Sequence, residues 1–234
     1  MKIVILSDLH GNFDALSSLP ERHYDELWVL GDLVNYGPQP VEVVDFVRSR
    51  ATIVVSGNHD LAVGFGQDPR CSPPFREMAA EMQKVSESLL NEEQKGYLQT
   101  LSLSSRFTRK GTTFYVCHAI PSDPLYGYCE SASDRWIEEC DKVAPDFLLV
   151  GHTHVPFVRK IGNCTVVNPG SLGQPKTGGP HACYAVWENG IVTLCTYVYP
   201  VEWTVSKIRA LPIPVKVQSD LIAVLETGLV PQIS

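Results

Sequence analysis

Short apolar runs alternate with helical patterns through the first sixty residues. The apolar runs, rich in Val, Ile and Leu, predict strands over 2–7, 26–30 and 52–56. Helical patterns follow over 13–19 and 41–48. Each predicted strand ends in a cluster of Gly, Asp, Asn or His. This alternation predicts parallel strands joined by helices, with polar side chains at the strand ends, where sheets of this kind keep their sites.

The middle of the chain has a helical pattern over 61–103, interrupted by a turn-rich stretch over 64–74. Asn91 and Gln94 fit a capping box at the start of its last helix. We interpret 61–103 as a helical insertion, or cap, over one rim of the sheet. A further helix is predicted over 131–143, with Ser131 and Asp134 as its capping box.

Strand patterns dominate the remainder. The dipeptide Asn189-Gly190 is typical of a type I′ hairpin turn, and a last helix is predicted over 219–227. The predicted strands lie over 112–117, 147–150, 155–161, 164–167, 183–188, 191–198 and 203–208. With no repeat and no linker, we expect a single domain over 1–234, with two sheets packed face to face and helices outside.

The amino-acid composition narrows the class of protein and its possible partners. The chain has 234 residues, of which 44% are apolar and 19% charged, with a net charge of −7. This acidic balance argues against long nucleic acid as a partner and against an anionic membrane surface. No apolar run approaches the ~20 residues of a membrane span. Seven scattered cysteines without a C-x-x-C pair suit reduced thiols. We therefore expect a cytoplasmic protein.

Five segments share one feature, a burst of Asp, Asn or His at the end of an apolar strand. In an extended or tightly turned segment, D-x-H and H-x-H spacing puts both side chains on one side, where they can bind one ion. Donors of this kind without thiolates suit divalent Mn, Fe, Zn or Co. Since a lone carboxylate such as Asp32 can bridge two ions, two ions are the natural count. The segments are Asp8-Leu9-His10, Gly31-Asp32, Gly57-Asn58-His59-Asp60, His118 and Gly151-His152-Thr153-His154.

This ordered set resembles the calcineurin-like metallophosphoesterase superfamily, and within it the branch of small YfcE-type phosphodiesterases. The resemblance implies an α/β fold, a four-layer αββα sandwich of two mixed sheets, and two divalent ions, with manganese favoured. It also implies His59 as the proton donor, held by Asp60. The implied ligands are Asp8, His10, Asp32 and His154 for one ion, and Asp32, Asn58, His118 and His152 for the other.

Two metal ions can lower the pKa of a shared water and neutralise the charge on a phosphoryl group, so no nucleophilic side chain is needed. His59 suits the proton donor because imidazole titrates near neutral pH. Phosphoprotein phosphatases of the superfamily read GDxVDRG where this chain has Tyr36 at the arginine position. The uncharged Tyr36 favours a monoanionic phosphodiester over a phosphomonoester, and argues against a protein phosphatase or dinucleoside tetraphosphatase of that branch.

Two alternatives remain open at this point. One is a phosphomonoesterase with the same fold, since a basic residue from the insertion could reach the site. The other is a scaffold that keeps the fold but performs no hydrolysis. The natural substrate, which we expect to be a small phosphoester, is not specified by the sequence. Aromatic side chains of the insertion and of the loop after His118 could stack on a base or simply pack. As for partners, we expect no membrane and allow for a homo-oligomer.

Overall fold

The computed structural model describes residues 1–229 and contains two five-stranded sheets. In the first sheet, the central strand β1 is parallel to β2, which is parallel to β3, and antiparallel to β9, which forms a hairpin with β10. The strand order is β10 (Ile191–Val198), β9 (His181–Glu188), β1 (Lys2–Leu6), β2 (Glu26–Val29) and β3 (Ile53–Val54).

The second sheet is also mixed. Strands β5, β6 and β8 are parallel, and an antiparallel strand lies at each edge. The order is β4 (Ser104–Arg109), β5 (Thr112–Cys117), β6 (Phe147–Leu149), β8 (Cys164–Asn168) and β7 (Phe157–Ile161). The carboxyl ends of the parallel strands are where the polar bursts of the sequence occur.

The sheets pack face to face through alternate positions of their strands. Ile3 and Ile5 of β1 belong to the core between the sheets, together with Trp28, whereas Val4 and its neighbours of the same parity pack against helices on the outer face. The ring centroids of Trp28 and Phe114, one from each sheet, lie 4.8 Å apart. The period of two in side-chain direction thus gives β1 two buried faces.

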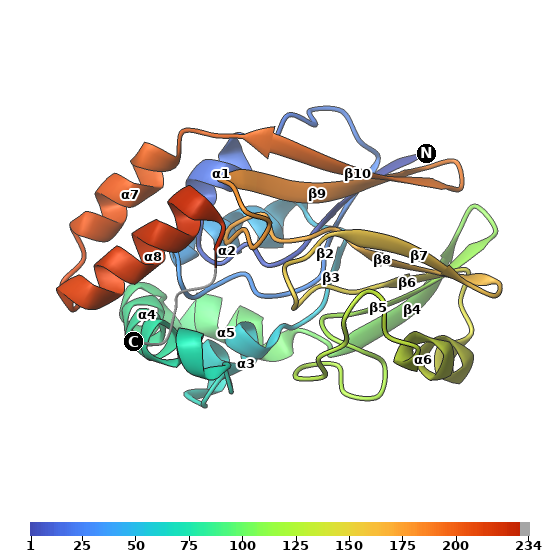
Figure 1. The fold of residues 1–234 in the computed structure, drawn as a ribbon, viewed down its shortest axis with the longest axis horizontal. Coiled ribbons are helices and arrows are strands. Elements are labelled where there is room, and N and C mark those ends of the chain that lie inside the picture. The colour runs from blue at the N-terminus through green and yellow to red at the C-terminus, as the bar shows by residue number, and fades with distance from the viewer. Residues whose placement is uncertain (230–234) are drawn as a thin grey trace.

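Helices complete the sandwich on both outer faces (Figure 1). Apolar side chains of α1 (Phe13–Ser17) and α2 (Pro40–Arg50) pack on the first sheet, and those of α6 (Arg135–Val143) pack on the second. The predicted four-layer αββα arrangement is therefore confirmed. The single-domain boundary of 1–234 stays a prediction, and its last five residues lie outside the described residues.

The segment predicted as an insertion is helical and packs against the end of the chain. It contains α3 (Asn58–Phe65), the short 3-10 helix η1 (Pro73–Phe75), α4 (Arg76–Leu89) and α5 (Glu92–Thr100), and α4 contacts α8 (Val215–Thr227). Figure 1 shows α4 beside α8, with α7 (Val201–Arg209) next to α8. The Asn91–Gln94 capping box is confirmed, with its two hydrogen bonds at 2.9 and 3.1 Å.

The prediction of a strand over 203–208 is wrong, because these residues lie in α7. Aromatic and β-branched residues favoured a strand there. The buried positions are Thr204, Val205 and Ile208, whose spacing of one and four residues is helical. Pro200 precedes the first helical residue, where its missing N–H costs the helix nothing.

The structure also differs from the sequence analysis at three smaller elements: β4, α6 and α8. Strand β4 was not predicted; it is rich in Ser, Thr and Arg because an edge strand keeps one side in water. Helix α6 begins only at Arg135, and Asp134 makes no capping hydrogen bond through its side chain, so the capping box with Ser131 is wrong. Helix α8 begins four residues earlier than predicted. The Asn189-Gly190 turn is confirmed, with φ of 51° and 89°.

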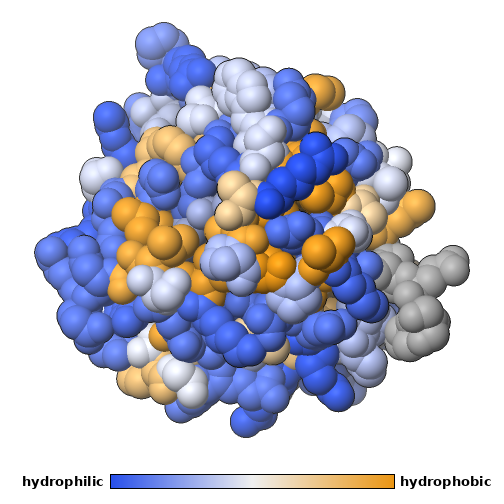
Figure 2. Space-filling model, turned by 90° about the vertical axis from the view of Figure 1, so that its left-hand side faces the viewer, coloured by the Kyte–Doolittle hydropathy of each residue, from blue (hydrophilic) through white to orange (hydrophobic). Residues whose placement is uncertain are grey.

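The face formed by α4, α7 and α8 carries several apolar side chains at its surface (Figure 2). Among them, Trp203 of α7 is 54% exposed and Val215 of α8 is 76% exposed. Within residues 1–229, no helix combines the length and the apolar character needed to cross a membrane.

Candidate metal centre

The seven predicted metal ligands converge at the carboxyl ends of strands from both sheets. In the first sheet they follow β1, β2 and β3; in the second they follow β5 and β6. All seven side chains are buried or half-buried. The seven are Asp8, His10, Asp32 and Asn58 on the first sheet's side, and His118, His152 and His154 on the second's.

One group of four matches the first ion of the predicted pair. Ligand atoms of Asp8, His10, Asp32 and His154 all lie within 4.8 Å of one another. His154 Nε2 is 3.2 Å from Asp8 Oδ1 and 3.1 Å from His10 Nε2. His10 Nε2 is 3.7 Å from Asp32 Oδ2. Two carboxylates and two imidazoles in one cluster can hold a divalent ion.

The second group surrounds the same Asp32. His118 Nε2 is 3.2 Å from Asp32 Oδ2 and 3.3 Å from His152 Nδ1. Asn58 Oδ1 is buried without a hydrogen-bond partner among the described residues, and Asn58 Nδ2 donates to the carbonyl oxygen of Pro69 at 2.8 Å. Asp32 Oδ2 therefore lies between the two groups, as a bridging carboxylate would.

Hydrogen bonds around the site leave ligand atoms free for a cation. The Nδ1 atoms of His10, His118 and His154 lie 3.2, 2.7 and 2.7 Å from backbone carbonyl oxygens, so Nδ1 carries a hydrogen and, in the neutral ring, Nε2 presents its lone pair to the cluster. Asp8 Oδ1 is buried and, within the described chain, has no hydrogen-bond partner. Facing lone pairs and orphaned oxygens are unfavourable without a cation, so these residues fit divalent ions.

The backbone at the predicted ligands is itself unusual. Five of the seven have a positive φ, between 45° and 65°, which costs a residue other than glycine of order 1–3 kcal/mol. Strained backbone of this kind clusters at functional sites. The five are Asp8, His10, Asp32, His152 and His154.

Burial and charge set the protonation of the histidines in the protein without ions. Burial lowers the pKa of His10 and His154, and it lowers that of His152 to about 3, so these imidazoles are neutral. Burial opposes a charge on His118 too, but the Asp32 and Asp8 carboxylates outweigh it and raise its pKa to about 10. Neutral imidazole is the form that binds metal, so ions here would displace at most the His118 proton.

His59 is held by Asn35, so the prediction that Asp60 holds it is wrong. Asn35 Nδ2 donates to the Ala79 carbonyl oxygen and lies 2.8 Å from His59 Nδ1, while Asn35 Oδ1 accepts from the backbone N–H of Tyr36. The amide nitrogen must therefore donate to Nδ1, which leaves the His59 hydrogen on Nε2. Burial lowers the pKa of His59 to about 4.

Asp60 instead ties the loop after β2 to the start of α3. Its carboxylate accepts hydrogen bonds from the backbone N–H groups of Asp32, Leu33 and Gly57 at 2.7 to 2.9 Å. Burial and the Asp32 charge raise its pKa to about 7, against the pull of these donors. A Cβ at Gly57 would lie 2.1 Å from Asp32 Oδ1, so only glycine allows this close approach. Asp60 therefore positions Asp32 and does not act on His59.

Comparison with known proteins agrees with this site. The family model of the calcineurin-like phosphoesterase superfamily domain matches residues 1–189. The chain belongs to this superfamily. Among relatives of this phosphoesterase, an uncharacterized protein of Methanocaldococcus jannaschii is 28% identical over 205 residues, 80% of this chain and 82% of the relative.

Among solved structures, a metallophosphoesterase from Sphaerobacter thermophilus has 30% sequence identity and a TM-score of 0.79, covering 96% of this chain and 99% of that one. A shorter similarity links 68 residues, at 43% identity, to the symmetrical bis(5'-nucleosyl)-tetraphosphatase of Psychromonas ingrahamii; it covers 26% of this chain and 25% of that enzyme. The structural similarity to the metallophosphoesterase thus extends over nearly the whole chain, whereas the sequence similarity to the tetraphosphatase is confined to a segment.

A cavity of about 290 Å³ adjoins the cluster of predicted ligands. Phe75, Tyr126 and Tyr128 line it, whereas Phe65 and Tyr97 do not contribute to its described lining. Two cations also line the cavity: Arg70 of the insertion, where the sequence analysis allowed for a basic residue, and Lys176, which it did not single out. The lining residues are Asp32, Tyr36, Asn58, His59, Arg70, Cys71, Ser72, Phe75, Tyr126, Tyr128, His152, His154 and Lys176.

The two cations of the cavity come from two different loops. Arg70 lies in the turn-rich part of the insertion, and Lys176 lies in the loop after β8. In the stretch 170–177, Pro175 lacks a backbone N–H, so the loop offers an anion the Lys176 side chain in place of a backbone donor at that position. Its place after a parallel strand of the second sheet was the available signal.

Tyr36 packs against the site and is only 5% exposed. Its ring meets those of His10 and His59 edge to face, at centroid distances of 4.9 and 4.8 Å. Its hydroxyl oxygen lies 3.3 Å from Cys71 Sγ. Tyr36 therefore supports the two histidines with an uncharged ring.

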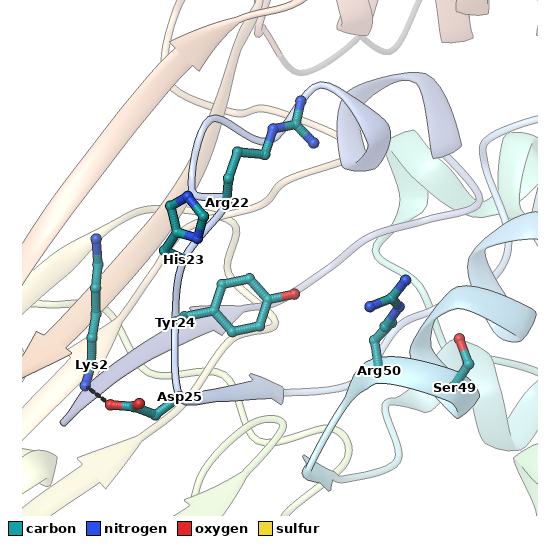
Figure 3. A pocket seen from close by; sticks show the side chains of 7 residues that line it. All are labelled: Lys2, Arg22, His23, Tyr24, Asp25, Ser49 and Arg50. Atoms are coloured by element: carbon teal, nitrogen blue, oxygen red, sulfur yellow. Dashed lines mark hydrogen bonds between the residues drawn. The ribbon is translucent and has the colours of Figure 1, made fainter.

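A second, more open hollow of about 530 Å³ lies at the amino ends of β1 and β2 (Figure 3). It is lined by Lys2, Arg22, His23, Tyr24, Asp25, Ser49 and Arg50. Asp25 accepts a hydrogen bond from the backbone N–H of Lys2 at 2.7 Å. The cations Arg22 and Arg50 are exposed, and none of the predicted ligands lines this hollow. Its arginines can therefore be compared with Arg70 and Lys176 as cations remote from the predicted ligands.

Proposed function

We propose that this protein hydrolyses a phosphodiester with the help of two divalent metal ions, of which manganese is favoured and iron, zinc or cobalt would also suit. The observation that carries the proposal is the convergence of two ligand groups on Asp32, beside a histidine whose Nε2 hydrogen faces a cavity. The free state of all seven cysteines supports a reducing compartment, which we take to be the cytoplasm.

When bound, the ions would supply an activated water and neutralise charge on the phosphoryl group. The chain's own contribution begins with His59, whose Nε2 hydrogen is placed to go to the oxygen that leaves. Donation starts from the imidazolium form, which a phosphate anion next to the ring favours: the Nε2 proton goes to the leaving oxygen and the ring returns to its neutral form. Since the imidazolium also carries a hydrogen on Nδ1, the Asn35 amide would then turn so that its Oδ1 accepts that hydrogen. Asn35 and Tyr36 keep the ring in place through Nδ1 and through ring contact.

The diester is favoured over a monoester because Tyr36, without charge, stands at the position where related phosphatases have arginine. A phosphomonoesterase is the second candidate, and Arg70 and Lys176 favour it, because they could offset the extra charge of a monoester dianion.

The experiment compares kcat/KM for bis(nitrophenyl) phosphate and nitrophenyl phosphate at the same metal loading. We expect the diester to be hydrolysed faster, and Tyr36→Arg to shift the ratio toward the monoester. Faster monoester hydrolysis by the wild type would make the protein a phosphatase. No turnover of either ester with two ions bound would leave a non-catalytic scaffold.

A further inference from the structure

Lys176 brings a half-buried positive charge to the cavity. Its ammonium lies 4.3 Å from the centre of the Phe75 ring, and neither a hydrogen bond nor an ion pair engages it within residues 1–229. The loop is anchored two residues earlier, where the Gln174 carbonyl oxygen accepts from His154 Nδ1. Because a half-buried ammonium without an ion-pair partner is unfavourable, its place in the cavity suits an anionic group of a ligand.

Arg70 brings a second cation from the insertion. Its guanidinium carbon lies 4.4 Å from the centre of the Tyr126 ring, and in the described part of the chain no carboxylate pairs with it. The preceding residue, Pro69, accepts a hydrogen bond from Asn58 Nδ2, and Arg70 itself has a φ of 56°. Each cation therefore lies within two residues of a backbone carbonyl that holds a predicted ligand.

We propose that Lys176 and Arg70 bind a second phosphoryl group of the substrate, separate from the one that is hydrolysed. This inference rests on the proposed function. Two divalent ions facing the Asp8 and Asp32 carboxylates leave a positive surplus before either cation is counted, whereas a simple diester carries one negative charge. A second phosphoryl group supplies the missing charge, and guanidinium and ammonium groups are its usual protein partners.

The cavity suits a substrate of this kind. Its volume of about 290 Å³ is on the scale of a small organic ligand, larger than one phosphoryl group requires. Tyr126 and Tyr128 line it together with Arg70 and offer ring faces to an organic group. The substrate class is thus a phosphoester or phosphoanhydride that carries at least one further phosphoryl group.

The test measures binding by calorimetry at a fixed free Mn²⁺ concentration. The probes are adenosine 5′-monophosphate and adenosine 5′-(α,β-methylene)diphosphate, which share base and ribose and differ by one phosphoryl group. We expect the wild type to bind the diphosphate at least about tenfold more tightly, as charge-assisted hydrogen bonds would give. Equal affinity for the two probes would overturn the proposal.

Substitutions of the two cations test which side chain causes the preference for the diphosphate. Lys176→Met should reduce the preference for the diphosphate to below about threefold, while Lys176→Arg should retain it, since charge is what binds. Arg70→Gln should reduce it less, because Arg70 is more exposed. Arg50→Gln, in the hollow at the other end of the sheet, is the matched control and should change nothing. If Lys176→Met weakened both probes equally, Lys176 would bind the hydrolysed phosphate and the proposal would be wrong.

The outcome is separable from that of the proposed function. Binding of the two probes is read without turnover, and metal content is measured in each variant. If bis(nitrophenyl) phosphate were not hydrolysed while the diphosphate preference and its loss in Lys176→Met were observed, only the hydrolytic proposal would fail. If hydrolysis occurred without any preference for the diphosphate, only the second phosphoryl site would fail.

Discussion

At the scale of single residues, the structure separates the side chains that could bind ions from His59, the predicted proton donor. The predicted ligands have their free atoms directed toward one another, whereas His59 has its Nδ1 occupied by Asn35 and its Nε2 at 3.5 Å from Cys71 Sγ in the cavity wall. Replacing a ligand and replacing His59 should therefore have different consequences.

His59→Ala should keep both ions and slow turnover by about 10²–10⁴ for alkyl leaving groups, the usual effect of losing a proton donor. The loss should be smaller on nitrophenyl esters, because nitrophenolate leaves without a proton. Steady-state kinetics with elemental analysis tests this. An equal loss on both kinds of ester, with ions retained, would give His59 a positioning role only.

Asn35→Asp should raise the pKa of His59, because an aspartate accepts from Nδ1–H and favours the charged ring. The protonated fraction of the ring then persists to higher pH, so hydrolysis of alkyl diesters should decline at higher pH than in the wild type. The matched variant Asn35→Leu should lower activity by about 10–100-fold, by loss of orientation. The pH dependence of kcat tests this prediction. Identical profiles in wild type and Asn35→Asp would contradict the assignment of Asn35 as the partner of His59 Nδ1.

At the scale of elements, the loop after β2 and the start of α3 form one hydrogen-bonded unit. Asp60 accepts from Asp32, Leu33 and Gly57, and the backbone N–H of His59 donates to Asp32 Oδ1 at 2.9 Å. The start of α3 thus holds one oxygen of Asp32 and leaves Oδ2 for the two ligand groups.

Asp60→Ala should lower the free energy of unfolding by roughly 3 kcal/mol or more, since three buried N–H groups lose a charged acceptor. It should also lower metal content through Asp32. Urea unfolding and elemental analysis measure the two effects. Asp146→Ala is the control, because the exposed Asp146 carboxylate accepts from Thr113 alone, and its loss should cost about 1 kcal/mol. Full metal content in Asp60→Ala would show that Asp32 does not depend on Asp60.

At the scale of the whole molecule, the metal-ligand cluster joins the two sheets. Asp8 and Asp32 follow strands β1 and β2 of the first sheet. His118 follows β5 of the second sheet, and His154 lies between its strands β6 and β7. Bound ions would therefore cross-link the layers of the sandwich and stabilise the folded state by mass action.

Removing the ions should lower the melting temperature. At a hundredfold excess over Kd, each site would contribute about 2.7 kcal/mol to the unfolding free energy. Calorimetry with and without chelator measures this. Asp32→Ala should melt at nearly the same temperature in both conditions, because both groups share this carboxylate. A wild type indifferent to chelator would contradict the metal centre.

Assembly also belongs to this scale. The homo-oligomer that the sequence allowed for stays a prediction. The apolar face that includes Trp203 and Val215 is the surface where such contacts could form.

The sequence alone determined the order of the strands and helices at the start of the chain and the place of the polar bursts at strand ends. These follow from local rules: a period of two in strands, and polar residues at the ends of parallel strands, which meet at one edge of a sheet. The seven predicted ligands and the shared place of Asp32 came from the resemblance of these bursts to the superfamily. The wrong strand over 203–208 came from the same local rules, applied where β-branched residues happened to lie on one face of a helix.

Only the tertiary structure decided which neighbour each site residue has. Asn35 contacts the His59 ring, and Asp60 accepts from backbone N–H groups of the loop after β2. Both contacts arise because the positive φ of Asn35 and the close approach at Gly57 bring the loop after β2 and the start of α3 together. Lys176 and Arg70 reach the same cavity from segments more than a hundred residues apart. Such encounters depend on how two sheets and an insertion pack, and no local pattern of residues records that packing.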